Sequence, residues 1–150
     1  LKLYYTFEYF IHDVKLFILS KYKLKNYKEL YILYNMSCLF DSLSYYLPGN
    51  SISIRTKICD YLKQNNKIID GMNTRDILNM ETSNYITNMR KQSTWGGAIE
   101  IQCACNIWKI RVLVEDKRHK KKHNVIEFIP INNTYNKTIH LKWSGGHYKK

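Results

Sequence analysis

A cysteine at the joint between two predicted elements is the residue of this sequence best placed to do chemistry. Cys38 follows an apolar run typical of a short strand, Tyr31–Tyr34, and begins a segment with helical character, Cys38–Leu47. The unpaired amides and the positive end of a helix dipole stabilise a thiolate and lower its pKa. The same N–H groups can bind the oxyanion that develops during acyl transfer. Cys38 is therefore a candidate nucleophile, with a packing role and a metal-ligand role as the alternatives.

A cysteine nucleophile needs a general base, and the chain offers five histidines. His147 follows two glycines at the entrance of a predicted strand, where the backbone is free to approach a groove. The others lie in a predicted helix, in a basic run and in the middle of a predicted strand: His12, His119, His123 and His140. The residues alone leave His147 open between a catalytic role and an ordinary surface or core role.

Other catalytic patterns are missing from the sequence. Ser37 and Ser44 lack a G-x-S-x-G context, and the chain has neither a glycine-rich phosphate loop nor an HExxH motif. Asp41, one turn after Cys38, is expected to be a favourable first-turn carboxylate. The remaining cysteines have the spacing of neither a disulfide framework nor a zinc knuckle, and we expect buried free thiols in a reducing compartment: Cys59, Cys103 and Cys105.

Composition indicates one folded, strongly basic domain. The chain has 150 residues, of which 45% are hydrophobic, enough to bury a core without disulfide bonds. A formal net charge of +12 attracts phosphate, so nucleic acid binding is an alternative function. The densest basic run, Asp116–His123, lies between two predicted strands and is expected to form a solvated hairpin tip. No zinc finger, RNP motif or helix-turn-helix pattern accompanies it.

Helix patterns come first along the chain and strand patterns last. An amphipathic N-terminal helix is predicted, with neither a signal peptide nor a membrane span. Pro48-Gly49 precedes a helix that is capped by Asn50 or Ser51 and carries an apolar stripe of Ile54, Ile58, Tyr61 and Leu62. Asp70–Thr82 is predicted to be a polar connection, and a short helix is predicted around Tyr85, Ile86 and Met89.

The segment after the next glycine pair is ambiguous. Residues 98–108 fit a strand or a helix that is buried nearly all round, and periodicity does not distinguish the two. Strands are predicted at Lys109–Glu115, Asn124–Ile129 and Thr138–Trp143, and a turn at Ser144–Gly146. Helices followed by strands indicate an α+β domain with a mostly antiparallel sheet.

Several landmarks occur in one order along residues 31–148, and together they make the chain resemble the ovarian tumour (OTU) cysteine proteases, deubiquitinases of cellular and viral origin. The family's D-G-N-C-L-F followed by a helix resembles residues 35–40 and the segment after them. A family helix with an internal arginine is similar to the segment around Arg55, and a Tyr–x3–Met segment leading to W-G-G-x-I-E-I is similar to Tyr85, Met89 and residues 95–101. The last landmark, a small residue followed by His-Tyr, is matched by Gly146-His147-Tyr148.

The resemblance implies a fold as well as a chemistry. It implies one OTU-like domain over residues 1–150, with residues 1–30 as an N-terminal helical extension. A small, mostly antiparallel sheet would be packed between helices, and the segment after the WGG motif would be a helix.

The implied activity is hydrolysis of the (iso)peptide bond after the C-terminal glycine of ubiquitin or a ubiquitin-like modifier. Cys38 would be the nucleophile, through a thioester intermediate, and His147 would carry the proton. Main-chain N–H groups of Met36, Ser37 and Cys38 would form the oxyanion hole. Trp95 and Tyr148 would flank the groove that admits the Gly-Gly tail. No metal and no organic cofactor is needed.

The chain departs from the family pattern beside the nucleophile. Asn35 stands where the family usually has Asp, Met36 where it has Gly, and Ser37 where it has Asn. Asn35 can still hydrogen-bond an imidazole N–H and orient His147, but it supplies no negative charge. Lys149 occupies a position where many members place Asn or Asp, and it cannot accept a hydrogen bond.

These departures leave an alternative: a catalytically weak or inactive OTU-like domain that binds ubiquitin or nucleic acid. The intact Cys38 and His147 favour the enzyme. The residue usage is typical of an AT-rich genome, which suggests a virus or another source with such a genome. A viral member would strip ubiquitin, or a ubiquitin-like antiviral modifier, from host proteins. The expected protein is a monomer in the host cytoplasm, without a membrane partner.

Overall fold

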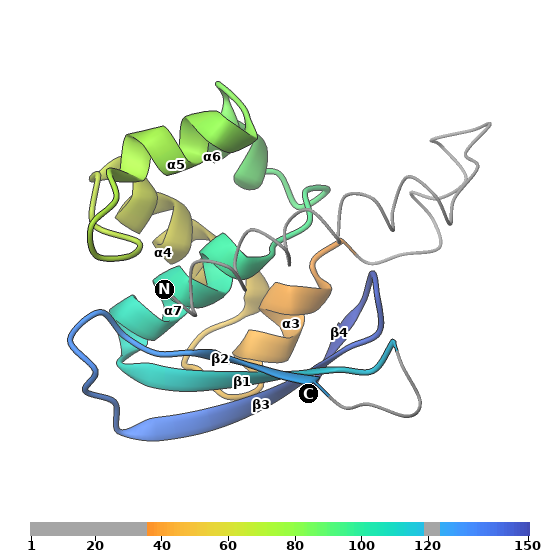
Figure 1. Cartoon of the computed structure of the whole chain (residues 1–150). Coiled ribbons are helices and arrows are strands. Elements are labelled where there is room, and N and C mark those ends of the chain that lie inside the picture. The colour runs from red at the N-terminus through yellow and green to blue at the C-terminus, as the bar shows by residue number, and fades with distance from the viewer. Residues whose placement is uncertain (1–35, 119–123) are drawn as a thin grey trace.

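The computed structural model describes residues 36–118 and 124–150, in which helices precede strands as predicted (Figure 1). The helices are α3 (Cys38–Ser44), α4 (Ser51–Lys63), α5 (Thr74–Glu81), α6 (Tyr85–Met89) and α7 (Ala98–Trp108). The strands are β1 (Ile110–Asp116), β2 (Asn124–Phe128), β3 (Lys137–Trp143) and β4 (Tyr148–Lys149). The predicted N-terminal helix and the strand at Tyr31–Tyr34 lie outside the described residues. The α+β fold class is confirmed, because a small, mostly antiparallel sheet lies among helices.

The strands form one sheet in the order β2-β1-β3-β4. Strand β1 is antiparallel to β2 and parallel to β3, and β3 is antiparallel to β4. Asp116 pairs with Asn124, so the basic run between them connects the two strands of a hairpin, as predicted. Of that run, residues 119–123 lie outside the described part of the chain.

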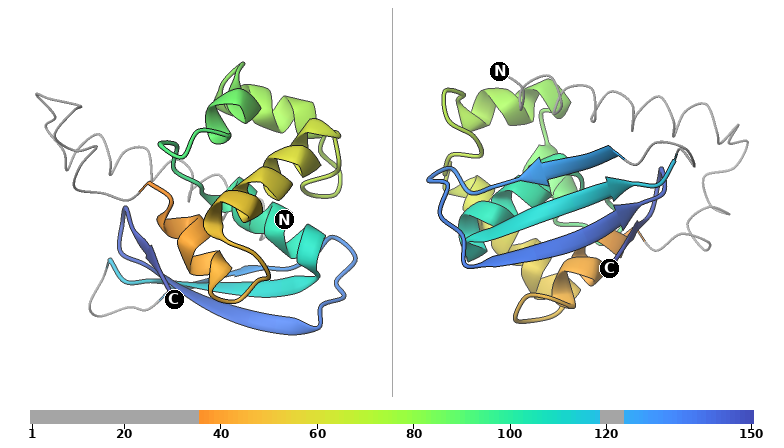
Figure 2. Two further views of the ribbon diagram at one scale, coloured as in Figure 1. Left: turned by 180° about the vertical axis from the view of Figure 1, so that it is seen from behind. Right: turned by 60° about the horizontal axis from the view of Figure 1, so that its bottom comes forward.

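One face of the sheet carries the core. Alternation in β3 buries Ile139, Leu141 and Trp143, the triad that the sequence predicted for one face. Helices α3 and α7 lie over this face, and α4 packs against both of them (Figure 2). In the described ranges, no helix is long and apolar enough to cross a membrane.

Helix α4 forms where its cap and its stripe predict it. The Asn50 side chain accepts a hydrogen bond from the Ser53 N–H at 2.9 Å, and Ser53 Oγ accepts one from the Asn50 N–H at 3.0 Å. Ile54, Ile58 and Leu62 of the stripe are buried. Arg55 is buried on the same helix although it lies outside the predicted stripe.

The predicted polar connection at Asp70–Thr82 is wrong, because Thr74–Glu81 forms helix α5. The Asn73 side chain caps this helix by accepting hydrogen bonds from the N–H groups of Arg75 at 2.9 Å and Asp76 at 3.3 Å. Two adjacent apolar residues, Ile77 and Leu78, are buried against the rest of the domain. A short helix needs little more than a cap and such an anchor, so its mostly polar sequence concealed it.

The ambiguous segment is helix α7, as the resemblance implied. Every residue from Ala98 to Asn106 is buried, which explains why the sequence showed no helical periodicity. The helix ends at Trp108, and the C-cap residue Lys109 has a left-handed φ of 52°. Helix α3 is shorter than predicted: it ends at Ser44 rather than Leu47.

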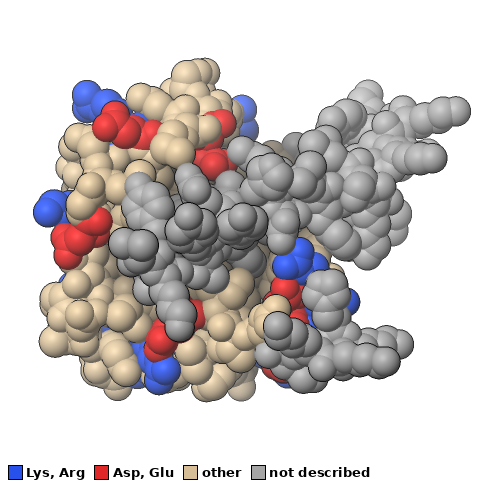
Figure 3. All heavy atoms as spheres, in the orientation of Figure 1, with Lys and Arg blue, Asp and Glu red and all other residues tan. Residues whose placement is uncertain are grey.

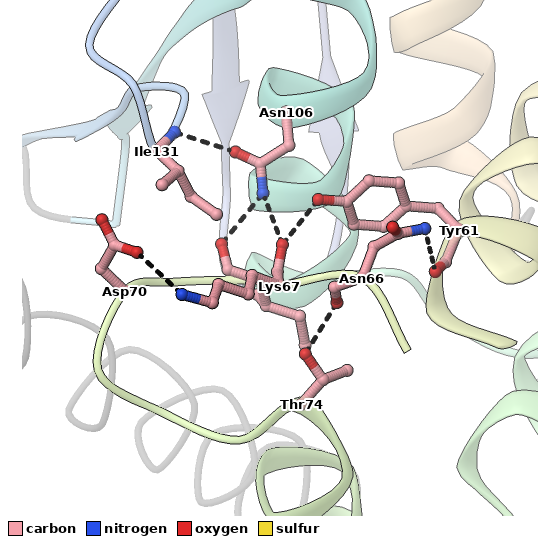
Figure 4. Close-up of polar contacts among 8 residues, drawn as sticks. Tyr61, Asn66, Lys67, Asp70, Thr74, Asn106 and Ile131 are labelled. Carbon is pink, nitrogen blue, oxygen red and sulfur yellow. Dashed lines mark hydrogen bonds and ion pairs between the residues drawn. The ribbon is translucent and has the colours of Figure 1, made fainter. Parts of the chain in front are cut away.

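A buried asparagine holds α7 in place. Asn106 Nδ2 donates to the carbonyl oxygens of Lys67 at 3.1 Å and Ile68 at 3.0 Å, and its Oδ1 accepts from the Ile131 N–H at 3.1 Å (Figure 4). The Tyr61 hydroxyl donates to the same Lys67 oxygen at 2.6 Å. One amide therefore joins α7 to the α4–α5 connection and to the chain after β2.

The charged side chains near the hairpin are partly paired with each other. Asp116, 4% exposed, accepts from Arg118 at 2.6 Å, and Lys117 pairs with Glu115. On the face shown in Figure 3, basic and acidic side chains of the described residues are scattered among each other. Among the described residues visible on that face, no gathered basic patch of the kind that the nucleic acid alternative requires is seen.

Gly96 brings the segment before α7 into direct contact with α3. A Cβ at this position would lie 2.8 Å from Leu39 Cδ2 and 2.9 Å from Phe40 Cζ, and both of these side chains are fully buried. The backbone can approach α3 this closely only without a side chain. The WGG motif thus fixes the distance between α7 and the helix that begins at Cys38.

Glu100, in the first turn of α7, joins α6 and the segment before α7 through two hydrogen bonds. It is 1% exposed, its Oε1 accepts from the Tyr85 hydroxyl at 2.6 Å, and its Oε2 accepts from the Gly97 N–H at 2.7 Å. Burial raises the pKa of its carboxyl from an ordinary value of 4.5 to about 6, against the opposing effect of these two hydrogen bonds.

Gly96→Ala should destabilise the fold by about 1–3 kcal/mol, because the added methyl overpacks two buried side chains. Gly97→Ala is the matched control, since a Cβ there meets no atom within 4 Å and the residue has a φ of −147°. Urea unfolding of both variants measures the difference. Equal losses of stability would show that the close approach at Gly96 does not matter.

The raised pKa of Glu100 predicts a pH-dependent stability. The folded state binds the proton more tightly than the unfolded chain, so this contribution is complete below pH 4.5 and is lost as the pH rises through about 6. The unfolding free energy of the wild type, measured relative to Glu100→Gln, should therefore fall by about 2 kcal/mol over this range. A difference that stays constant from pH 4 to pH 7 would contradict the assignment.

Candidate active site

Cys38 is the first residue of α3 and is 8% exposed. The Ser37 carbonyl accepts the first hydrogen bond of the helix, from the Asp41 N–H at 2.8 Å, so the amides of Cys38, Leu39 and Phe40 have no acceptor within the helix. Leu39 and Phe40 are fully buried and anchor this first turn in the core. The position that the sequence predicted for Cys38, at a helix start, is confirmed.

The C-terminal strand brings the predicted histidine beside the predicted nucleophile. The Tyr148 N–H donates to Cys38 Sγ at 3.4 Å, so β4 lies directly against the start of α3. His147 precedes Tyr148, and its carbonyl oxygen accepts from the Ser144 N–H at 3.1 Å. The turn before it uses positive φ angles at Gly145, 88°, and Gly146, 151°. The structure therefore places the main chain of His147 next to Cys38.

Trp95 lies against the same turn. A Cβ on Gly146 would meet Trp95 Cη2 at 3.5 Å, so the indole ring covers the residue directly before His147. Trp95 Nε1 is buried and has no hydrogen-bond partner among the described residues. Three segments thus meet at one place: the start of α3, the segment before α7 and the turn before β4.

Tyr148 contributes its main chain rather than its ring. Its side chain is 6% exposed and packs beside Trp143, with 6.5 Å between the ring centroids. Burial raises the pKa of its phenol well above the ordinary value. The role of Tyr148 in flanking the narrow groove for the Gly-Gly tail stays a prediction.

Burial opposes ionisation of the Cys38 thiol. Burial raises its pKa above the ordinary value of 9.0, while the N–H groups of Tyr148 and Leu39 lower it and the Asp41 charge raises it. The helix amides act in the expected direction, but loss of solvent outweighs them. The lowering effect of the helix amides is as the sequence predicted, and the larger effect of burial leaves the pKa of Cys38 above its ordinary value.

The other predicted site residues are placed as follows. Met36 and Ser37 form a turn directly before α3, whereas Asn35 lies outside the described residues. His140 is exposed on the face of β3 opposite the buried triad, as predicted. His12, His119 and His123 lie outside the described residues.

The remaining cysteines are buried and free, as predicted. Burial raises the pKa of Cys59 to about 11 and of Cys105 to about 12, and it raises that of Cys103 as well. These thiols lack the electropositive, accessible surroundings of reactive cysteines. Within residues 36–118 and 124–150, no three His, Cys, Asp or Glu side chains gather as a metal site would require.

Sequence reasoning did not assign roles to two buried charged residues near Cys38. Arg55 donates to Ser37 Oγ at 3.3 Å, and Glu100 accepts the Gly97 N–H as described above. Both occur in the landmarks that resembled the family, and this was the only signal that the sequence carried for them. Burial of a charged residue depends on which elements meet around it, and composition does not reveal that.

Comparison with solved structures shows the same fold. A structure of an OTU domain in complex with ubiquitin gives a TM-score of 0.60 at 22% identity, over 76% of this chain and 62% of that one. The viral OTU domain protease from Dera Ghazi Khan virus gives 0.55 at 21% identity, over 76% and 72%. An OTU deubiquitinase from Wolbachia pipientis wMel bound to ubiquitin gives 0.53 at 16% identity, over 76% and 88%.

Comparison at the level of sequence gives the family. No curated protein matches the chain. The family model of the OTU-like cysteine proteases matches residues 37–149, a range that contains both Cys38 and His147. The chain therefore belongs to the family of OTU-like cysteine proteases.

Proposed function

We propose that this protein is a deubiquitinating cysteine protease, which cleaves the (iso)peptide bond after the C-terminal glycine of ubiquitin or a ubiquitin-like modifier. The observation that carries the proposal is the hydrogen bond from the Tyr148 N–H to Cys38 Sγ, because it brings the segment with His147 against the nucleophile. Membership of the OTU-like cysteine proteases supports it. The ubiquitin bound to two similar solved structures supports the choice of substrate.

The first half of the reaction forms a thioester. His147 removes the proton of the Cys38 thiol as Sγ bonds to the carbonyl carbon of the terminal glycine. The raised pKa of that thiol makes this proton transfer part of the attack. N–H groups of Met36, Ser37 and Cys38 stabilise the oxyanion of the tetrahedral intermediate. His147 then gives its proton to the leaving amine as the C–N bond breaks.

The second half releases the product and restores the enzyme. Water gives a proton to His147 and bonds to the thioester carbon. The C–S bond then breaks, His147 returns its proton to Cys38, and the new carboxylic acid releases the other water proton to solvent, so that ubiquitin leaves with a free carboxylate. Asn35 orients the imidazole by accepting its N–H. Each step uses side chains and main-chain groups of the protein and requires no metal or organic cofactor.

Trp95 is the substrate-binding residue in this proposal. Its indole ring covers Gly146, and its N–H is a buried donor without a partner among the described residues. An unpaired buried donor costs about 1–3 kcal/mol, which an acceptor on the incoming tail would recover. The narrow Gly-Gly tail of ubiquitin carries main-chain carbonyls that can serve as this acceptor.

We further propose a viral setting for this activity, with removal of ubiquitin from host proteins in the cytoplasm as its role. The AT-rich residue usage and the likeness to the viral OTU domain protease from Dera Ghazi Khan virus support this setting.

A ubiquitin probe with a C-terminal electrophile tests the proposed chemistry. The wild type should form a covalent adduct, and Cys38→Ala should lose it completely because the attacking sulfur is gone. Cys59→Ala is the matched control, since it also removes a buried thiol and should keep the adduct. Intact mass spectrometry measures all three proteins. Ubiquitin binding without an adduct in the wild type would make the domain a binding module.

Replacement of Trp95 tests the groove. Trp95→Phe should lower kcat/KM for a ubiquitin substrate about 2- to 10-fold, the worth of one net hydrogen bond. Trp108→Phe is the matched control, because Trp108 is also half-buried but lies at the far end of α7. Steady-state hydrolysis of ubiquitin with a fluorogenic leaving group measures both. An equal effect of the two changes would remove Trp95 from the site.

A further inference from the structure

Arg55 is a buried cation that faces the catalytic segment from α4. It is 2% exposed, and its guanidinium carbon lies 3.9 Å from the centroid of the Phe40 ring. Phe40 belongs to the first turn of α3 and is itself fully buried. The guanidinium therefore stacks on the first turn of the helix that begins with Cys38.

The guanidinium also binds the segment that leads to Trp95. Its Nη1 donates to the carbonyl oxygens of Met89 and Thr94, both at 2.8 Å, and its Nη2 donates to that of Gln92 at 3.4 Å. Thr94 directly precedes Trp95. These carbonyls belong to the last residue of α6 and to the chain between α6 and α7, so one planar group sets the path of the chain from the end of α6 to Trp95.

Nη2 of Arg55 also contacts Ser37, the residue directly before Cys38. Nη2 donates to Ser37 Oγ at 3.3 Å, and Ser37 Oγ in turn donates to the Gln92 carbonyl at 3.3 Å. Ser37 is the N-cap position of α3, and no hydrogen bond from its side chain caps the helix. Its hydroxyl is directed to Arg55 and Gln92 instead. Arg55 thus contacts the chain immediately before Cys38 and the chain immediately before Trp95.

Packing alone does not explain an arginine at this position. Among the described residues, no carboxylate forms an ion pair with its guanidinium, and its hydrogen bonds go to uncharged acceptors, namely three main-chain carbonyls, the Ser37 hydroxyl and the Met89 sulfur. A buried cation costs several kcal/mol in lost hydration, and an apolar residue of similar volume fills such a space at lower cost. A fixed fork of donors, however, holds several acceptors at set angles, which an apolar side chain does not.

We propose that Arg55 is a positioning residue for catalysis: it fixes the main chain before Cys38 relative to the main chain before Trp95. The inference rests on the proposed function. The Trp95 ring covers Gly146, the neighbour of His147, so the two segments held by Arg55 flank both reacting partners. A displacement of about 1 Å between such groups reduces the rate of reaction about 100-fold.

Arg55→Met and Arg55→Lys test the proposal in the full chain. Met removes the charge and the fork, whereas Lys keeps the charge and loses the fork. Per active site titrated with the ubiquitin probe, Arg55→Met should lower kcat at least about tenfold, with KM within about threefold of the wild type. Arg55→Lys should recover only part of this loss. Arg75→Met is the matched control on an exposed helix position and should match the wild type.

Titration of active sites separates positioning from stability. If Arg55 only stabilised the fold, the surviving folded molecules would turn over at the wild-type rate, and this result would overturn the proposal. Full recovery by Lys would also overturn it, because the charge and not the fork would then suffice. Should both Arg55 variants fail to fold, Ser37→Ala removes one acceptor and leaves the guanidinium in place. It should lower kcat without raising KM, and an unchanged kcat would count against the proposal.

A second measurement works without ubiquitin, so that failure of the proposed function is recognised separately. If the wild type forms no adduct with the probe, the proposed function fails, and alkylation of Cys38 by iodoacetamide decides the role of Arg55. The rate in Arg55→Met should then differ at least about threefold from the wild-type rate, with Arg75→Met unchanged. Equal rates in all three proteins would overturn the positioning role. Peptide mass spectrometry distinguishes Cys38 from the buried cysteines.

Discussion

The arrangement of this site depends on how closely the backbone at Gly96 approaches helix α3. With no side chain at Gly96, the WGG segment lies directly on Leu39 and Phe40, and the start of α7 is brought against the helix that begins at Cys38. Trp95 is then carried over Gly146, and the turn before β4 follows from that contact. A structural requirement at one glycine therefore determines where three distant segments meet.

The groups around Cys38 are arranged at a cost to stability. Arg55, Glu100 and the Cys38 thiol are all removed from water, and each has its pKa shifted toward the uncharged form by burial. Their hydrogen bonds go largely to main-chain groups, which hold loops in place rather than neutralise charge. Buried polar groups with such hydrogen bonds are common at sites where geometry matters more than stability.

The sequence predicted those elements whose signals are local. Helix α4 followed from its cap and its stripe, and β3 followed from alternation. Helix α5 was missed because its sequence is mostly polar, and α7 stayed ambiguous because burial on all sides erases periodicity. The sequence also placed Cys38 correctly at a helix start, yet the net direction of its pKa depends on how deeply the first turn is buried. Asn35 stays a prediction, since it lies outside the described residues.

The contact of β4 with α3 bears on when, during synthesis and folding, the site around Cys38 forms. The hydrogen bond between Tyr148 and Cys38 joins residues 110 positions apart in the chain. During synthesis, the helices and the β1–β2 hairpin emerge long before the last strand does, and contacts of such large separation form late in folding. Cys38 is therefore made early, and the segment with His147 reaches it late in folding. The contact between Cys38 and the segment with His147 therefore cannot form before the chain has been synthesised through Tyr148.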